Sequence, residues 1–133
     1  MQRSVQGSLK TRVLLAEDNK DTLEVLRRGL EWLNYEIIAA KDGIEAVELA
    51  TSEVPDLIIL DVVMPKMGGL EAASQIKNNP KTQVIPILAI TAMAQAGDQK
   101  KCLQSGCDAY IAKPFTFEKL EAAIKRLLKD SSN

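Results

Sequence analysis

The chain has 133 residues and a mass of 14.6 kDa, which is the size of one compact domain. Its 17 basic and 18 acidic residues leave a formal net charge of −1, which argues against nucleic-acid or membrane binding driven by bulk charge. Histidine is absent, so no catalytic triad, metal site or phosphate carrier in this chain uses an imidazole. The spacing of Cys102 and Cys107 does not fit a Cys-x-x-Cys motif, and we expect two reduced thiols.

Polar segments flank a single body. We expect a flexible leader over residues 1–11, a folded domain over residues 12–129 and a short tail over residues 130–133. The leader lacks the apolar core of a signal peptide, and the longest apolar stretch, Val84–Ile90, is too short to span a bilayer. These observations predict a soluble, cytoplasmic protein without membrane insertion.

Short apolar runs alternate with helical patterns along the body. The runs cover residues 13–16, 35–39, 57–60, 87–90 and 109–112. Three of the five are continuously apolar, which is typical of strands in a parallel sheet that is covered on both faces. We therefore interpret all five runs as strands.

The segments between the runs have the spacing of amphipathic helices, with leucines recurring at three- and four-residue steps over 23–33. Asp42 and Glu45 have the spacing of a capping box, and Thr116 is placed to cap the last helix. Gly106 is placed to end the fourth helix in the left-handed conformation. Five strands alternating with five helices predict a doubly wound α/β fold with a mostly parallel sheet.

The residues that follow each strand matter most, because open α/β sheets bind ligands beyond the carboxyl ends of their strands. These residues are Glu17, Asp18 and Asn19 after the first run, Asp61 after the third, Thr91 after the fourth, and Lys113 and Pro114 after the fifth. Each alone has an ordinary explanation as a cap, a turn or an exposed charge. Together they place three carboxylates and one ammonium at one sheet edge.

Such a cluster carries an excess of negative charge that is costly away from bulk water. Two remedies exist: some carboxylates take up protons, or a divalent cation binds. Oxygen ligands select a hard cation, and Mg²⁺ suits two or three carboxylates with retained waters. A hydroxyl at Thr91 and an ammonium at Lys113 would face a polyoxygen anion, for which a phosphoryl group is the natural candidate.

Four motifs lie at the strand ends: Leu15–Asn19 (LAEDN), Leu60–Gly69 (LDVVMPKMGG), Ile90–Ala92 (ITA) and Tyr110–Phe115 (YIAKPF). Taken in this order and at these spacings, they resemble the receiver domains of two-component response regulators over about residues 11–129. The resemblance implies a flavodoxin-like parallel sheet of five strands in the order 2-1-3-4-5. It also implies a role for each matching residue.

In the family pattern, Asp61 resembles the phosphoacceptor. Asp18 and Asp61 look like direct Mg²⁺ ligands, joined by the main-chain carbonyl of Val63. Glu17 looks like the residue that holds the ion through water. Mn²⁺ is the alternative ion that the resemblance allows.

Other matching positions belong to the part of the family pattern that responds to phosphorylation. Thr91 and Lys113 resemble residues that contact phosphoryl oxygens, and Tyr110 occupies the aromatic switch position. The Lys113–Pro114 bond matches one that is often cis in the family. The sequence departs from the family at Gly68, where an Asp or Asn is common, and the two adjacent glycines make that loop freer.

The resemblance implies a phosphorylatable switch that accepts a phosphoryl group from a phosphohistidine on a sensor histidine kinase or a histidine phosphotransfer protein. The changed surface would then bind an unknown downstream target, and a homodimer is a further outcome of phosphorylation. We expect no enzymatic activity beyond self-phosphorylation and self-dephosphorylation. The stretch Thr91–Ala94 is similar to stand-alone relay receivers and to receivers of hybrid kinases. We expect no attached output domain, which leaves a stand-alone regulator or a receiver from a larger protein.

Three other classes of protein fit the sequence less well. A hydrolase of the haloacid dehalogenase type would need a second Asp two residues after Asp61, where this chain has Val63. A flavodoxin-like cofactor binder would need small polar residues after the first strand, where this chain has acids. A docking module that is never phosphorylated is disfavoured by the complete residue set. Val63 and Met93 are apolar where family members admit water, so we expect slow self-dephosphorylation.

Overall fold

The structure is a computed structural model that describes residues 10–92 and 97–131. Strands and helices alternate strictly along the described chain. In order they are β1 (Arg12–Ala16), α1 (Lys20–Trp32), β2 (Glu36–Ala40), α2 (Gly43–Glu53), β3 (Leu57–Asp61), α3 (Gly69–Lys77), β4 (Ile87–Thr91), α4 (Asp98–Gln104), β5 (Ala109–Ala112) and α5 (Phe117–Ser131). The predicted alternation of five strands and five helices is confirmed.

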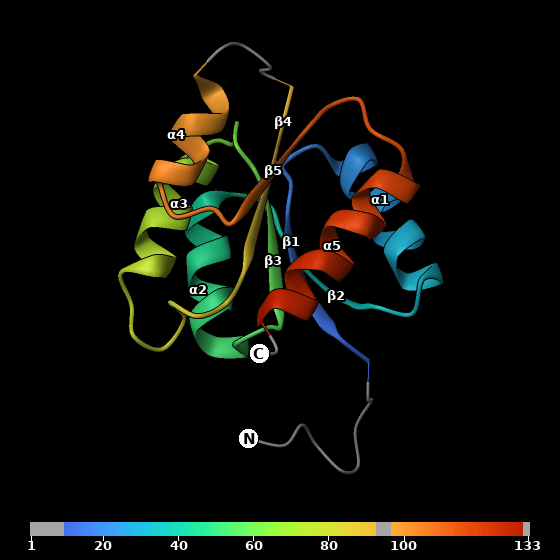
Figure 1. Cartoon of the computed structure of the whole chain (residues 1–133), viewed down its shortest axis with the longest axis horizontal. Helices are drawn as coiled ribbons and strands as arrows, with labels where there is room; N and C mark the ends of the chain where they lie inside the picture. Colours follow the sequence, from blue (N-terminus) through green and yellow to red (C-terminus); the bar gives the residue numbers. More distant parts are fainter. Residues whose placement is uncertain (1–9, 93–96, 132–133) are drawn as a thin grey trace.

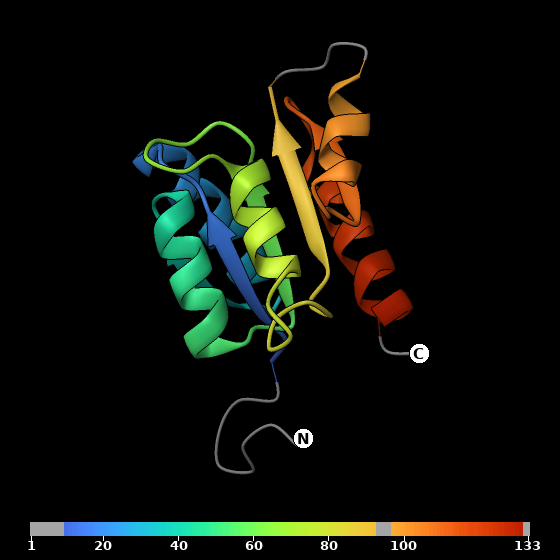
Figure 2. The ribbon, with the colours of Figure 1, turned by 90° about the vertical axis from the view of Figure 1, so that its left-hand side faces the viewer.

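The five strands form one parallel sheet in the order β2-β1-β3-β4-β5, as expected. Helices α1 and α5 cover one face of the sheet, and α2, α3 and α4 cover the other (Figure 1). Figure 2 shows the same layers from the side of α2 and α3, with the sheet behind them. This double cover explains why the central strands read as continuous apolar runs.

Side chains of the central strands alternate between two cores. In β1, Val13 and Leu15 pack on the side of α1 and α5, whereas Leu14 and Ala16 pack on the side of α2, α3 and α4. All five residues of β3 and of β4 are buried. The period of two in a strand therefore fixes which residues each helix layer contacts.

Local signals in the sequence correctly placed several helix ends. Asp42 Oδ1 accepts a hydrogen bond from the Glu45 N–H at 2.8 Å, as the capping box predicts. Thr116 Oγ1 accepts one from the Lys119 N–H at 3.1 Å at the start of α5. Gly106 follows α4 with a φ of 104°, in the left-handed region.

Several boundaries differ from the expected ones: β1 begins one residue earlier, and β2, β3 and β4 each end one residue later. The second strand begins at Glu36 and not at Tyr35, because the Tyr35 N–H donates to the Leu30 carbonyl at 3.1 Å and closes the end of α1. Helix α5 continues through Ser131, so the segment expected to be a tail, residues 130–133, begins inside the helix.

Both cysteines are free and buried, and burial raises the pKa of the Cys107 thiol to about 12. Among the helices described, none is long and apolar enough to cross a membrane.

Candidate functional site

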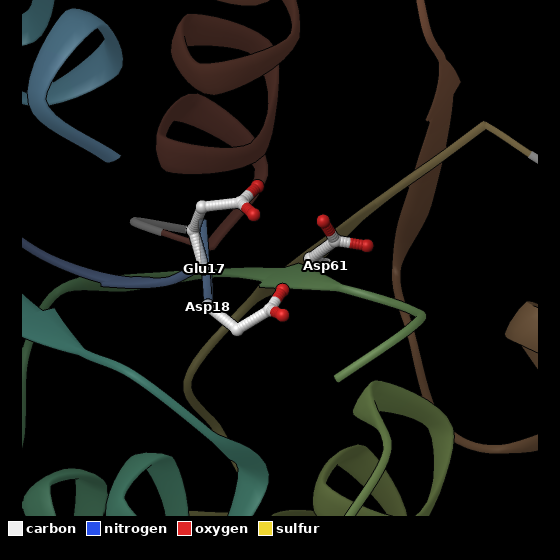
Figure 3. Close-up of side chains that lie close together, drawn as sticks. All are labelled: Glu17, Asp18 and Asp61. Atoms are coloured by element: carbon white, nitrogen blue, oxygen red, sulfur yellow. The ribbon is translucent and has the colours of Figure 1, made fainter. Parts of the chain in front are cut away.

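The strand ends bring the predicted acidic residues together. Glu17 and Asp18 directly follow β1, and Asp61 is the last residue of β3. Because β1 and β3 are parallel neighbours, their carboxyl ends meet at one edge of the sheet. Figure 3 shows the three carboxylates gathered around a common space at that edge.

The three carboxylates form a cluster with the chemistry of a hard-cation site. Glu17, Asp18 and Asp61 each offer an oxygen that lies within 4.8 Å of the other two. Glu17 is 2% exposed and Asp61 is 5% exposed, while Asp18 faces solvent. Buried carboxylates this close repel one another unless a cation or a proton lies between them. The donor set therefore fits a divalent metal ion bound by oxygen.

Lys113 supplies the positive charge at this edge. Its Nζ donates to Asp61 Oδ2 at 2.8 Å and to Glu17 Oε1 at 3.3 Å. Burial opposes the charged ammonium, but the hydrogen bond and charge of Asp61, with help from Glu17, raise the pKa of Lys113 above its usual value. Lys113 is therefore charged at neutral pH, and one ammonium faces three acidic groups.

The pKa of Glu17 is raised above its usual value. Burial is the main cause that raises the pKa of Glu17, and the neighbouring Asp61 raises it further. The Asn19 N–H, which donates to Glu17 Oε2 at 3.1 Å, and the charge of Lys113 lower it only in part. Asn19 itself does not join the cluster with its side chain, since its Oδ1 caps α1 by accepting from the Thr22 N–H at 2.9 Å.

Asp61 is held by donors on both carboxylate oxygens. The Val63 N–H donates to Oδ1 at 3.0 Å, while Lys113 holds Oδ2. The Val62 N–H, next along the chain, donates to the Ile90 carbonyl at 2.9 Å and ties this segment to β4. The carboxylate of Asp61 is thus fixed in orientation at the centre of the site.

The expected switch residues lie beside this centre. Thr91 ends β4 and is 1% exposed, and its carbonyl accepts from the Lys113 N–H at 2.8 Å. Tyr110 is half-buried and packs against the core on the side of α2, α3 and α4. The Lys113–Pro114 peptide bond is cis. Met93 lies outside the described residues.

Sequence reasoning did not find one group of residues next to the site. The loop that follows Asp61 contacts the start of α2, where the Gly43 N–H donates to the Met67 carbonyl at 3.1 Å. The adjacent Asp42 and Lys66 approach to 3.8 Å between Oδ2 and Nζ. The Asp42-Gly43 pair was visible in the sequence, but it predicted only a helix cap.

A doubly wound parallel sheet whose carboxyl edge holds three acidic groups and one lysine has the architecture of a phosphoryl-accepting signalling domain. The family model described as the response regulator receiver domain matches residues 13–125. The chain therefore belongs to the response regulator receiver family.

Relatives in sequence support the same family. The polar-differentiation response regulators DivK of Brucella anthropi and Brucella ovis are each 37% identical to this chain over 119 residues, which cover 90% of this chain and 97% of each relative. The chain is thus similar to response regulators along nearly their whole length.

Solved structures give the same result. A response regulator from Chloroflexus aurantiacus matches with a TM-score of 0.86 and 28% identity, covering 90% of this chain and 98% of that one. The receiver domain of sensor histidine kinase PA1611 from Pseudomonas aeruginosa, solved with a magnesium ion coordinated in its active-site cleft, matches with a TM-score of 0.85 and 34% identity over the same shares.

These findings establish the class of function. The chain is a phosphorylatable signalling switch of the two-component type and not a classical enzyme. Domains of this family interact with histidine kinases and with downstream targets. The hydrolase alternative is not favoured.

Proposed function

We propose that Asp61 accepts a phosphoryl group from a phosphohistidine on a partner kinase or phosphotransfer protein, in a reaction that requires Mg²⁺. The observation that carries this proposal is the environment of the Asp61 carboxylate. One oxygen lies 2.8 Å from the Lys113 ammonium, the other accepts from the Val63 N–H at 3.0 Å, and two further acids lie within 4.8 Å. The magnesium-bound Pseudomonas receiver supports the choice of ion.

Each of these residues would have a defined role in the phosphoryl transfer. An oxygen of Asp61 attacks the phosphorus atom, the phosphorus–nitrogen bond breaks, and the imidazole leaves with the bonding electron pair. Lys113 holds the carboxylate beforehand and pairs with the transferred group afterwards. Asp18, Asp61 and the Val63 carbonyl would hold Mg²⁺, with Glu17 acting through water. The ion would supply charge neutralisation for the phosphoryl oxygens.

The switch would follow from the new charge on Asp61. A phosphoryl group offers oxygens to which the Thr91 hydroxyl can donate, and such charge-assisted bonds are short and strong. Movement of Thr91 would leave room for Tyr110, which is half-buried, to turn inward. The surface near α4 and β5 would then change by a shift between two populated states.

We further propose that the protein works in the cytoplasm, as a member of the response regulator receiver family. Homodimer formation after phosphorylation is part of the same proposal.

Acetyl phosphate with and without Mg²⁺ tests the acceptor, with intact mass as the readout. We expect the wild type to gain the mass of one phosphoryl group only when Mg²⁺ is present. Asp61→Asn should show no gain, whereas Asp21→Asn, which alters a carboxylate on α1 outside the cluster, should behave like the wild type. A phosphoryl group that still forms in Asp61→Asn, mapped to another residue, would contradict the assignment.

A further inference from the structure

The loop between β3 and α3, residues 62–68, begins directly after Asp61 and contains Val63. We call this loop the strap. Its two ends are fixed to each other, because the Gly69 N–H donates to the Val62 carbonyl at 2.9 Å. Its near end is also tied to β4 through the Val62 N–H and the Ile90 carbonyl at 2.9 Å. These two hydrogen bonds do not hold the far part of the strap, around Lys66 and Met67.

The start of α2 anchors that far part. The Gly43 N–H donates to the Met67 carbonyl at 3.1 Å, and the preceding residue, Asp42, places Oδ2 3.8 Å from Lys66 Nζ. The Asp42 side chain is 6% exposed, so this ion pair is screened by water on one side only. Lys66 has a φ of 66°, in the left-handed region that non-glycine residues rarely adopt. Asp42 and Gly43, two successive residues at the start of α2, therefore contact Lys66 and Met67, two successive residues of the strap.

The contact at Gly43 leaves no room for a side chain. A Cβ placed on Gly43 would lie 2.1 Å from the Met67 oxygen and 2.8 Å from the Met67 carbonyl carbon. Real Cβ contacts stay above 3.0 Å, so the strap would have to move by about 0.9 Å or α2 would have to move away. Both neighbours are backbone atoms, which cannot rotate aside as the end of a side chain can.

Gly68 offers a contrast within the same strap. A Cβ there would meet only the Val62 carbonyl oxygen, at 3.3 Å. Its φ of −73° and ψ of 166° are ordinary for any residue. A change from Gly to Ala at residue 68 therefore adds the same methyl group with little displacement.

We propose that Gly43, with Asp42 beside it, is a positioning residue for the metal site, although neither belongs to the site. The pair holds the strap so that the Val63 N–H stays on Asp61 and the Val63 carbonyl stays available to the ion. The start of α2 thereby helps to set the affinity for Mg²⁺. This inference rests on the proposed function, because it concerns the Mg²⁺ that phosphorylation of Asp61 requires.

The size of the effect follows from the fraction of molecules in which the strap is correctly placed. The apparent dissociation constant equals the intrinsic constant divided by that fraction. A displacement near 1 Å is large compared with the tolerance of Mg²⁺, which demands near-ideal octahedral geometry. We therefore expect Gly43→Ala to weaken Mg²⁺ binding by about tenfold or more.

Titration calorimetry with MgCl₂ on the wild type, Gly43→Ala and Gly68→Ala tests the proposal. Gly43→Ala should raise the dissociation constant about tenfold, and Gly68→Ala should keep it within about twofold. Phosphorylation by acetyl phosphate should need more Mg²⁺ in Gly43→Ala yet approach the wild-type rate at saturating Mg²⁺. A merely structural role would lower the melting temperature and leave the Mg²⁺ dependence unchanged, and that result would overturn the proposal.

A measurement on the wild type covers the case in which Gly43→Ala does not fold. Coupling is reciprocal, so an ion that binds better to the correctly placed strap must also stabilise the strap. Saturating Mg²⁺ should therefore slow hydrogen exchange of the Gly43 amide more than that of the Glu45 amide, which is bonded to Asp42 in the same helix start. Equal slowing of both amides, or none, would overturn the inference. If the wild type binds no Mg²⁺ at all, the proposed function itself fails.

Discussion

Replacing Asp18 with asparagine removes one of three crowded carboxylates while keeping the shape of the side chain. At a separation of 4.8 Å, the outer limit within the cluster, two unit charges repel by ~0.9 kcal/mol in a water-like dielectric. Asp18 faces two such partners and is itself exposed, so the water-like value applies, and the neighbouring Lys113 offsets part of it. We expect Asp18→Asn to stabilise the metal-free protein by ~1 kcal/mol at low salt, which raises the melting temperature by about 4 °C.

The response to Mg²⁺ should change in the opposite direction. For the wild type, MgCl₂ at ten times its dissociation constant stabilises the folded state by ~1.4 kcal/mol. Asp18→Asn lacks a direct ligand in the proposed site, so the same addition should leave its melting temperature almost unchanged. Thermal melts of both proteins at pH 7 and low ionic strength, with and without MgCl₂, give the four melting temperatures to compare.

A matched control separates this local effect from a change in overall charge. Glu48→Gln removes an exposed carboxylate on α2 and changes the net charge by the same amount. It should leave both the metal-free melting temperature and the Mg²⁺ response as in the wild type. The reasoning is refuted if Asp18→Asn melts below the wild type without metal, or if Mg²⁺ still stabilises it to the wild-type extent.

Four other measurements test further parts of the structure. The double variant Val63→Asn with Met93→Gln should lose its phosphoryl group faster than the wild type. Each tenfold gain in the rate of hydrolysis corresponds to ~1.4 kcal/mol off the barrier. An unchanged rate of decay after the donor is removed would show that these side chains do not set the lifetime. Gly68 caps α3 without a side-chain hydrogen bond, so Gly68→Asn should raise the free energy of unfolding in urea by about 0.5–1 kcal/mol. With a pKa of about 12, Cys107 in the folded protein should resist alkylation at pH 8 until denaturant is added. Folding raises the pKa of Glu17 above 4.5, so the metal-free protein loses the stability linked to that proton as pH rises above about 4.5. Glu17→Gln cannot lose this proton. Its melting temperature relative to the wild type should therefore increase between pH 4.5 and 7.

The sequence, together with the family resemblance of its motifs, was sufficient for the architecture and for the prediction that three acidic residues lie together. Continuous apolar runs indicated buried parallel strands, and β3 and β4 are buried at every residue. Because parallel strands end at one edge, the residues after each run were expected to meet, and Glu17, Asp18 and Asp61 do meet. Helix caps such as Asp42 were also predictable, since a cap is a contact between residues only three positions apart.

Other features depended on the packing of distant segments. Lys113 could be assigned to the correct sheet edge, but its pairing with Asp61 and Glu17, 52 and 96 residues away, follows from how β1, β3 and β5 are placed in the sheet. The contact of Gly43 with the strap is another case, because the sequence marked Gly43 only as the residue after a cap. Periodicity determines which face of an element is buried, whereas the atom that each buried group finally contacts is decided by the distance and angle at which whole elements pack together.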